Sequence, residues 1–250
     1  MIATKPMKVL DLFSGIGGFS LGLERAGMET AAFVEIDGAA RSVLSKRWPE
    51  TPIYTDVRSV TKTQLESDGI TGIDVICGGF PCQDISLAGR GLGLAGERSG
   101  LWFEYARLID ELQPKAVIAE NVSVLRSRGL DAVLRSLDEI GYDAEWHCIP
   151  ASAVGAPHQR DRIWIVAYPR SAGLSGPLIS GDSLPLATRT EFAQLGDLDV
   201  PVGPSWPSHT EYLRVGDGVS RGMDRLKQCG NAVVPQIPEA IGRVLMETFA

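Results

Sequence analysis

The chain has 250 residues, of which 44% are hydrophobic and 22% are charged, a composition typical of a globular protein with one main core and at most a small second part. Its formal net charge of −7 excludes binding to nucleic acid through overall positive charge, although a local basic groove could still bind phosphates. The sequence contains no run of about eighteen consecutive apolar residues, which a membrane span would require. An intracellular protein without a membrane segment is therefore expected.

Four cysteines are scattered along the chain, at Cys77, Cys82, Cys148 and Cys229. They show neither the paired spacing of a metal site nor the density of a disulfide framework. A cytoplasmic, reducing environment and no bound metal are expected. Cationic side chains gather at residues 160–162 and 214–227, where either a solvated surface or a phosphate-binding surface is consistent with the sequence.

The first elements form a pattern of strand, glycine turn and helix. A strand is predicted over residues 8–13, a turn with three glycines over residues 14–18, and a helix over residues 19–26. A second strand, residues 30–34, ends in Glu35, and an acidic residue about twenty positions after such a turn is placed to bind ribose hydroxyls. Tight packing of the turn is the alternative explanation. Neither a phosphate-cradling loop nor a complete dinucleotide fingerprint follows, so S-adenosylmethionine is the expected ligand.

A second candidate region begins where the apolar run of residues 73–77 meets two glycines. A buried strand is predicted to end there and to present Pro81 and Cys82 at the edge where open α/β sheets place their ligands. Cys82 is a candidate nucleophile, although a lone cysteine is more often a small buried hydrophobic residue. The glycine-rich residues 87–100 have no helix or strand period and are predicted to form a loop.

Further elements follow in alternation. Helices are predicted over residues 101–112 and 130–140, and a strand over residues 116–119 that ends in Glu120. Residues 145–149 and 162–167 resemble a pair of strands. The alternation of side chains along an extended chain would aim Arg160 and Arg162 to one side.

Five motifs carry a family resemblance. In chain order they read DLFSGIGG, GGFPCQDIS, ENV, HQRDRIWIV and GNAVVPQIPEAIGR. They resemble the ordered motifs of DNA cytosine-5 methyltransferases, in a short form similar to bacterial and phage enzymes, over residues 8–167 and about 216–243. The resemblance implies an α/β Rossmann-like, doubly wound and mostly parallel sheet, S-adenosylmethionine as methyl donor and double-stranded DNA as partner. It also implies the cytoplasm of a bacterial or phage-infected cell, and a role such as restriction-modification.

The resemblance also assigns catalytic roles. Cys82 would attack ring carbon 6 of a cytosine flipped out of the duplex, and Glu120 would contact ring nitrogen 3 and the exocyclic amine. Arg162, together with Arg160, would bind the base carbonyl. Residues 87–100 would close on DNA as a lid, and its hinge and phosphate contacts are predicted at Gln83, Ser86, Arg90 and Arg98.

For the cofactor, the resemblance places each residue at one part of the ligand. The methionine and ribose end would lie against Phe13, Gly15, Gly17 and Gly18, with the ribose hydroxyls on Glu35. The adenine would lie against Asp56, which could instead be a helix or turn cap, with Ile36 and Val57 on its two faces. Leu101 and Asn231 complete the predicted site, and a last helix over residues 237–249 is predicted to pack on the first one.

The sequence departs from the family pattern in three places, one of which is an arginine-rich motif before the final region that survives only faintly at residues 215–228. Residues 168–215, where the family carries a target-recognition domain, are short and rich in proline, glycine and serine, which divides the chain into a catalytic part, 1–167 with 216–250, and a reduced recognition segment. His158 stands where glutamine is common. A monomeric DNA cytosine-5 methyltransferase is the main prediction. An RNA-directed methyltransferase and an inactive DNA-binding or regulatory relative are the alternatives.

Overall fold

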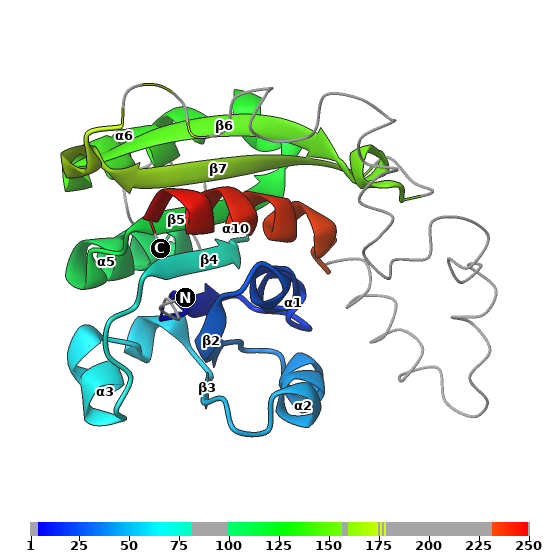
Figure 1. Cartoon of the computed structure of the whole chain (residues 1–250), viewed down its shortest axis with the longest axis vertical. Helices are drawn as coiled ribbons and strands as arrows, with labels where there is room; N and C mark the ends of the chain where they lie inside the picture. Colours follow the sequence, from blue (N-terminus) through cyan, green and yellow to red (C-terminus); the bar gives the residue numbers. More distant parts are fainter. Residues whose placement is uncertain are drawn as a thin grey trace.

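The computed structural model describes residues 5–81, 100–156, 160–174, 176, 178 and 232–249. This part of the chain forms a seven-stranded sheet in the order β3-β2-β1-β4-β5-β7-β6 (Figure 1). The strands are β1 Lys8–Leu12, β2 Glu29–Val34, β3 Ile53–Tyr54, β4 Val75–Gly79, β5 Ala116–Val122, β6 Tyr142–Pro150 and β7 Asp161–Pro169. The first five are parallel, while β7 runs antiparallel to both of its neighbours. The predicted doubly wound, mostly parallel α/β sheet is therefore confirmed.

Helices cover both faces of this sheet. They are α1 Gly18–Arg25, α2 Gly38–Arg47, α3 Lys62–Ser67, α5 Gly100–Leu112, α6 Leu130–Ile140 and α10 Gln236–Phe249. Short 3-10 turns connect several elements: η1 Val57–Ser59, η3 Ser123–Ser127, η4 Ala151–Val154 and η5 Arg170–Ala172. Of the helices that the structure describes, none is long and apolar enough to cross a membrane.

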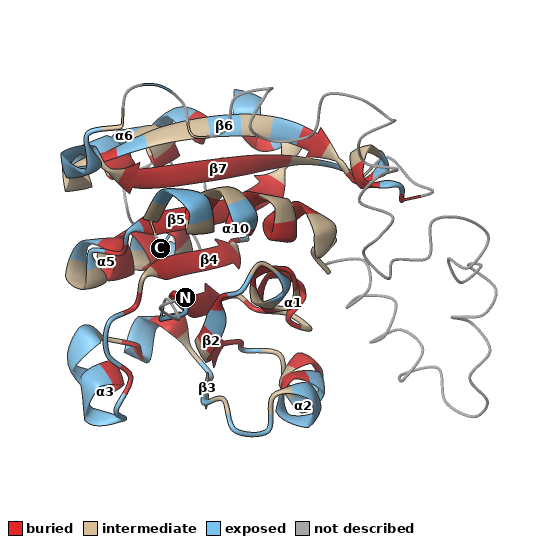
Figure 2. Ribbon diagram, viewed as in Figure 1, coloured by how far each residue is buried: buried red, intermediate tan, exposed pale blue. Residues whose placement is uncertain are grey.

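Two hydrophobic clusters lie on the two faces of the sheet. One joins the sheet to α3, α5 and α6 and includes the large side chains Trp102 and Tyr105. The other joins it to α1 and α10 and includes Phe19 and Trp164, whose ring centroids lie 5.5 Å apart. Figure 2 shows the central strands almost entirely buried, while α2 and α3 expose their outer surfaces.

The first and last helices pack directly on each other, as predicted. A β-carbon at Gly22 would lie only 2.2 Å from the carbonyl oxygen of Pro235, and one at Gly242 would lie 2.9 Å from the β-carbon of Ala26. Each helix therefore contributes a glycine where the two backbones approach most closely. The buried Glu239 on α10 accepts a hydrogen bond of 2.8 Å from Arg243.

The predicted elements are confirmed, and their ends coincide, as in α6, or differ by up to three residues. The largest shifts are at the start of β6, which is Tyr142 instead of residue 145, and at the end of β5, which is Val122 instead of residue 119. Helices α2 and α3 were not predicted from the sequence. Both bury few side chains, with only Ala40 and Leu44 buried in α2 and only Leu65 in α3, so neither shows a clear apolar period.

Candidate active site

The turn after β1 has a strained backbone at the edge of a pocket. Phe13 has a φ angle of 53° and Gly15 one of 54°, and a positive φ is costly for a bulky side chain such as phenylalanine. The Ser14 hydroxyl holds the turn in place by donating to the carbonyl oxygen of Asp11 at 2.6 Å and accepting from the amide of Val34 at 3.2 Å. The turn is thereby tied to both β1 and β2.

The Glu35 carboxylate joins this turn to the end of β2. Its Oε2 accepts from the Gly15 amide at 2.7 Å, and its Oε1 accepts from the Asp37 amide at 2.7 Å. A carboxylate oxygen can accept more than one hydrogen bond. Both oxygens therefore retain acceptor capacity for hydroxyl groups of a ligand at the pocket that Glu35 lines.

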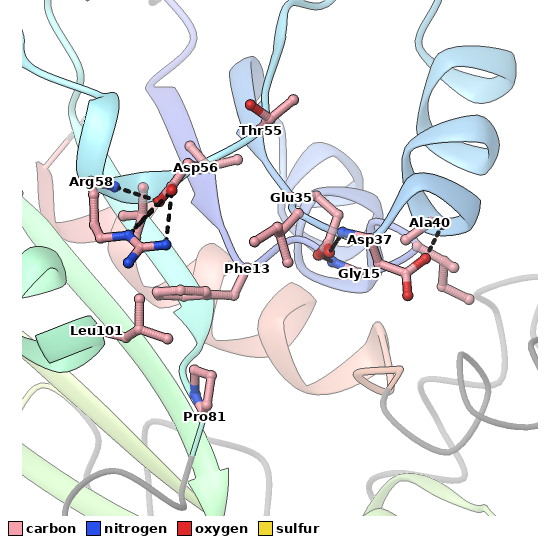
Figure 3. A pocket seen from close by; sticks show the side chains of 14 residues that line it. Phe13, Gly15, Glu35, Asp37, Ala40, Thr55, Asp56, Arg58, Pro81 and Leu101 are labelled. Atoms are coloured by element: carbon pink, nitrogen blue, oxygen red, sulfur yellow. Dashed lines mark hydrogen bonds and ion pairs between the residues drawn. The ribbon is translucent and has the colours of Figure 1, made fainter. Parts of the chain in front are cut away.

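The pocket has a volume of about 480 Å³, within the usual range for small-molecule sites. Figure 3 shows the three acidic residues of the pocket in two groups, with Glu35 and Asp37 beside Gly15, and Asp56 beside Arg58. The residues predicted for the cofactor that line it are Phe13, Gly15, Glu35, Ile36, Asp56, Val57 and Leu101. Ile36 is 70% exposed, which is unusual for a large apolar side chain and leaves it available to cover a ligand.

Two predicted cofactor residues, Gly17 and Gly18, are not among the residues that line the pocket. A β-carbon at Gly17 would lie 2.6 Å from the Trp48 ring, and one at Gly18 would lie 2.6 Å from the carbonyl oxygen of Val233. Both glycines therefore permit close packing behind the turn, which is the alternative that the sequence left open. Asn231, the remaining predicted cofactor residue, lies outside the described residues.

Asp56 has two roles in the structure. Its side chain caps η1 by accepting from the amide of Arg58 at 3.0 Å, and it forms an ion pair of 3.0 Å with the Arg58 guanidinium. These hydrogen bonds from Arg58 lower the pKa of the Asp56 carboxyl. Thr55, Arg58 and Asp37 also line the pocket but were not predicted as site residues, and Pro81, which was predicted at the sheet edge beside Cys82, lines it as well. Each of them lies next to a predicted site residue in the sequence, and this position could have indicated that it lines the pocket.

A buried ion pair lies at the carboxyl end of β5. Arg162 Nε contacts Glu120 Oε1 at 2.8 Å, with the side chains only 21% and 11% exposed. The strand register explains the pair: Glu120 lies opposite Trp164 and Val122 lies opposite Arg162, so the two side chains are diagonal neighbours on one face. A β-carbon on Gly79 would lie 2.9 Å from Glu120 Oε2, so that glycine makes room for the carboxylate.

The charges around Glu120 act in opposite directions. Burial raises the pKa of the Glu120 carboxyl above its ordinary value, and the positive charges of Arg162 and Arg160 oppose that shift. The result is a carboxyl group that holds a proton more readily than an exposed glutamate does. Such a group can act as a proton donor as well as an anchor for a polar ligand.

Arg160 is only partly arranged as the sequence indicated. Its backbone has a φ of 38°, so the alternation of an extended chain does not reach it, and its Nη2 donates to the carbonyl oxygen of Ala232 at 2.8 Å. It is still close enough to Glu120 for the two charges to affect each other. Burial lowers the pKa of the Arg160 guanidinium, as does the charge of Arg162, while Glu120 raises it.

Asn121 was not predicted as a site residue. Its side-chain amide donates to the carbonyl oxygen of Phe80 at 2.8 Å, and its Oδ1 accepts from the amide of Val122 at 2.8 Å. It thereby joins the end of β5 to the segment that leads from β4 to Pro81. Asn121 could have been predicted as a site residue because it is a polar residue in an apolar strand and directly follows Glu120. Cys82 follows Pro81 in the sequence and lies outside the described residues, as do Gln83, Ser86, Arg90, Arg98 and His158.

The pocket and the ion pair are neighbours at the carboxyl edge of the sheet. Gly79 faces Glu120, and Pro81, two residues later, lines the pocket. No group of three or more histidine, cysteine or acidic side chains suited to a metal ion occurs within the described ranges. The arrangement can bind a ligand with hydroxyl groups and an apolar ring beside a carboxyl–guanidinium pair that can bind a second, polar ring.

Comparison with known proteins identifies the family. The family described as C-5 cytosine-specific DNA methylase matches residues 7–200. Type II methyltransferase M.CviJI from Paramecium bursaria Chlorella virus IL3A is 39% identical over 162 residues, which are 64% of this chain and 42% of the relative. Type II methyltransferase M.Eco47II from Escherichia coli is 35% identical over 210 residues, 80% of this chain and 49% of the relative. The aligned part of this chain thus spans less than half the length of these two relatives.

Solved structures agree in fold. A prophage-encoded E. coli protein assigned as a DNA modification methyltransferase gives a TM-score of 0.58 at 30% identity and covers 71% of this chain and 50% of its own. The structure of a Spodoptera frugiperda DNMT2 mutant gives a TM-score of 0.55 at 25% identity, with 65% of this chain and 50% of its own covered. On the family match over residues 7–200, this chain belongs to the C-5 cytosine-specific DNA methylase family.

Proposed function

We propose that this protein transfers a methyl group from S-adenosylmethionine to carbon 5 of a cytosine in double-stranded DNA. The observation that carries the proposal is the buried Glu120–Arg162 pair, 2.8 Å apart, which lies against Gly79. The polar edge of a ring could bind to this pair, with the Glu120 carboxyl as proton donor or acceptor and the Arg162 guanidinium as cation. It lies beside a separate pocket with its own carboxylate, Glu35, as a reaction between a base and a nucleoside cofactor requires.

The pocket residues fit S-adenosylmethionine. Glu35 retains acceptor capacity for the two ribose hydroxyls, and the exposed Ile36 and the buried Val57 offer apolar surfaces for an adenine. Asp56 offers a carboxylate to the adenine amine, in competition with Arg58. Bound there, S-adenosylmethionine supplies an electrophilic methyl group.

The chain's own residues would activate the base. Carbon 5 of cytosine is a poor nucleophile, so the Cys82 thiolate adds to carbon 6 and forms a carbon–sulfur bond. The electron pair displaced from the ring moves toward nitrogen 3, where Glu120 donates its proton. The raised pKa of Glu120 favours this role because the carboxyl takes up a proton more readily than an exposed glutamate does. Carbon 5 would take the methyl group, with the electron pair of the broken bond left on the cofactor sulfur, and the proton on nitrogen 3 would return to Glu120. Carbon 5 would then lose its own proton to solvent as Cys82 leaves as thiolate.

Arg162 would orient both the Glu120 carboxyl and the cytosine base. Its guanidinium is fixed on Glu120 at 2.8 Å and can direct a further N–H group to the base carbonyl. The pair can contact only a base outside the stack, so the cytosine must be flipped out of the duplex. Residues 87–100 would close over it. We assign methyl transfer to residues 1–167 together with 216–250, and recognition of the DNA sequence to residues 168–215. We propose that the protein acts as a monomer.

The direct test is expression in a host without cytosine methylation, followed by bisulfite sequencing of its DNA. Protected cytosines are expected in one recurring sequence context. Cys82→Ser is expected to remove protection while the purified protein still binds S-adenosylmethionine in calorimetric titration. Full protection by the Cys82→Ser protein would exclude the covalent mechanism.

The RNA-directed alternative and the inactive alternative are tested by the same preparation. Transfer of a labelled methyl group to unmethylated duplex DNA is compared with transfer to structured RNA. Label in RNA alone would replace the proposed substrate. Label in neither, with cofactor binding intact, would favour the inactive relative.

A further inference from the structure

Almost every arginine in the described part of the chain has a partner. The partners are carboxylates, backbone carbonyl groups or, for Arg47, the Trp48 ring. Within the described residues, the arginines whose side chains make no such contact are Arg126, Arg128 and Arg135. Arg135 lies in α6 with Asp131 and Glu139 one helical turn away on either side, so opposite charge surrounds it.

Arg126 and Arg128 have no such surroundings. Both are exposed, and residues 123–130 contain no acidic side chain. The acidic residues that flank this stretch are Glu120, which is paired with Arg162, and Asp131. In a chain with a net charge of −7, this is a local surplus of positive charge that no carboxylate among the described residues neutralises.

The two arginines are held in a defined place. They belong to η3 and its end, which follow Val122 directly, and Val122 is the cross-strand partner of Arg162. Leu125 is fully buried and anchors the turn, and the amide of Arg128 donates to its carbonyl oxygen at 3.0 Å. The turn therefore lies at the rim of the site that holds Glu120 and Arg162, on the same edge of the sheet.

We infer that η3 and Arg128, here called the η3 basic turn, bind the DNA phosphate backbone next to the flipped cytosine. The inference rests on the proposed function. A base that reaches Glu120 remains linked through its sugar to two phosphates, which must lie near the rim. Exposed arginines that no carboxylate neutralises form favourable contacts with phosphate. Val124, 49% exposed in the same turn, adds an apolar surface that can lie against the sugar. These contacts carry no sequence preference.

The test is the salt dependence of binding to a fluorescein-labelled duplex of mixed sequence. Each cation that neutralises a phosphate contributes about −0.9 to the slope of log K against log salt concentration. For Arg126→Gln/Arg128→Gln we expect weaker binding and a slope less steep by about 2. Arg126→Lys/Arg128→Lys keeps both charges and is expected to keep the slope.

The matched control is Lys46→Gln/Arg135→Gln, which removes two exposed cations that make no ion pair among the described residues. Lys46 lies in the last turn of α2 and Arg135 on α6, so the slope of this control should equal that of the original protein. Thermal unfolding monitors the fold of each variant. An unchanged slope in the Arg126→Gln/Arg128→Gln protein, with binding and methyl transfer intact in the original protein, overturns this inference alone. Absence of duplex binding by the original protein overturns the proposed function as well.

Discussion

Asp11 is a fully buried carboxyl group behind the turn after β1, residues 13–18, here called the cofactor turn because Phe13 and Gly15 line the proposed cofactor pocket. Its Oδ2 accepts from the Ser20 hydroxyl at 2.7 Å and from the Ser20 amide at 3.3 Å, in the first turn of α1. It thereby caps a helix whose own N-terminal residue, Gly17, offers no side chain. Burial raises the pKa of Asp11 from 3.8 to about 7, although the hydrogen bonds from Ser20 oppose the shift. The group therefore changes its charge near neutral pH.

The first prediction concerns the pH dependence of stability. Well below pH 4, Asp11 is protonated in both the folded and the unfolded protein, so it does not lower the free energy of unfolding there. As the pH rises from about 4 to 7, the unfolded chain releases this proton while the folded protein retains it until about pH 7, so the free energy of unfolding loses on the order of 4 kcal/mol from this group. Asp11→Asn imitates the protonated form, and its stability relative to the original protein should rise over this range in urea titrations.

The control for this titration is Asp131→Asn, an exposed carboxyl in the first turn of α6. This variant shows how removal of an exposed carboxyl changes stability in the same titration. A constant difference between Asp11→Asn and the original protein across these pH values would mean that the pKa of Asp11 is not raised in the folded protein.

At the scale of elements, the segment before α10 connects the two halves of the site. Ala232 accepts from Arg160, which adjoins the Glu120–Arg162 pair, and the carbonyl oxygen of Val233 lies against Gly18 behind the cofactor turn. Arg160 thus contacts the backbone of a segment 72 residues away in the sequence. We assign it as a positioning residue, whereas the sequence indicated a direct contact with the base.

The second prediction is a coupling between Arg160 and Gly18. Arg160→Ala should lower kcat and also weaken S-adenosylmethionine binding, because it releases Ala232 from the position that supports the turn. Gly18→Ala displaces Val233 from the other side. Their combined effect on the cofactor Kd should differ from the sum of the single effects by about 0.5–3 kcal/mol. A cofactor Kd unaffected by Arg160→Ala would leave Arg160 with a role at the base alone.

The sequence was sufficient for the elements that bury a regular face. Residues 130–140 have a clear helical apolar period, and α6 has these bounds. The sequence was insufficient where an element is stabilised by single contacts. Helix α2 is stabilised by the Asp37 cap and by Trp48, whose ring centroid lies 5.1 Å from that of Phe33. Within the site, motifs predicted seven of the residues that line the pocket, whereas Gly17 and Gly18 lie behind the turn. The contact of Arg160 with Ala232 depends on long-range packing, which no local pattern encodes.

At the scale of the whole molecule, the close crossing of α1 and α10 joins the beginning and the end of the described chain. The third prediction is that Gly22→Ala destabilises the protein by about 1–3 kcal/mol, because its β-carbon meets the carbonyl oxygen of Pro235 at 2.2 Å. Alanine favours an isolated helix over glycine, so a loss of stability here would come from the crossing. Urea unfolding followed by tryptophan fluorescence measures it.

Gly38→Ala is the matched substitution. Gly38 begins α2, and its nearest contact for a β-carbon is the Arg41 side chain at an ordinary 3.6 Å. This variant should be as stable as the original protein or up to about 1 kcal/mol more stable. Equal effects of the two substitutions would show that the crossing tolerates a methyl group.

The antiparallel direction of β7 has a consequence for how the recognition segment joins the protein. Arg162 lies at the carboxyl edge, and seven residues later, about 24 Å away, the strand ends at Pro169 on the amino edge, where the Arg170 amide donates to the carbonyl oxygen of Gly141. The chain returns at Ala232, again beside Arg160. The proposed recognition segment, 168–215, therefore starts far from the Glu120–Arg162 pair, whereas the chain is next described close to that pair, at Ala232. An exchange of this segment between relatives should keep the junction at residues 232–234 intact, whereas the junction after Pro169 can vary in length.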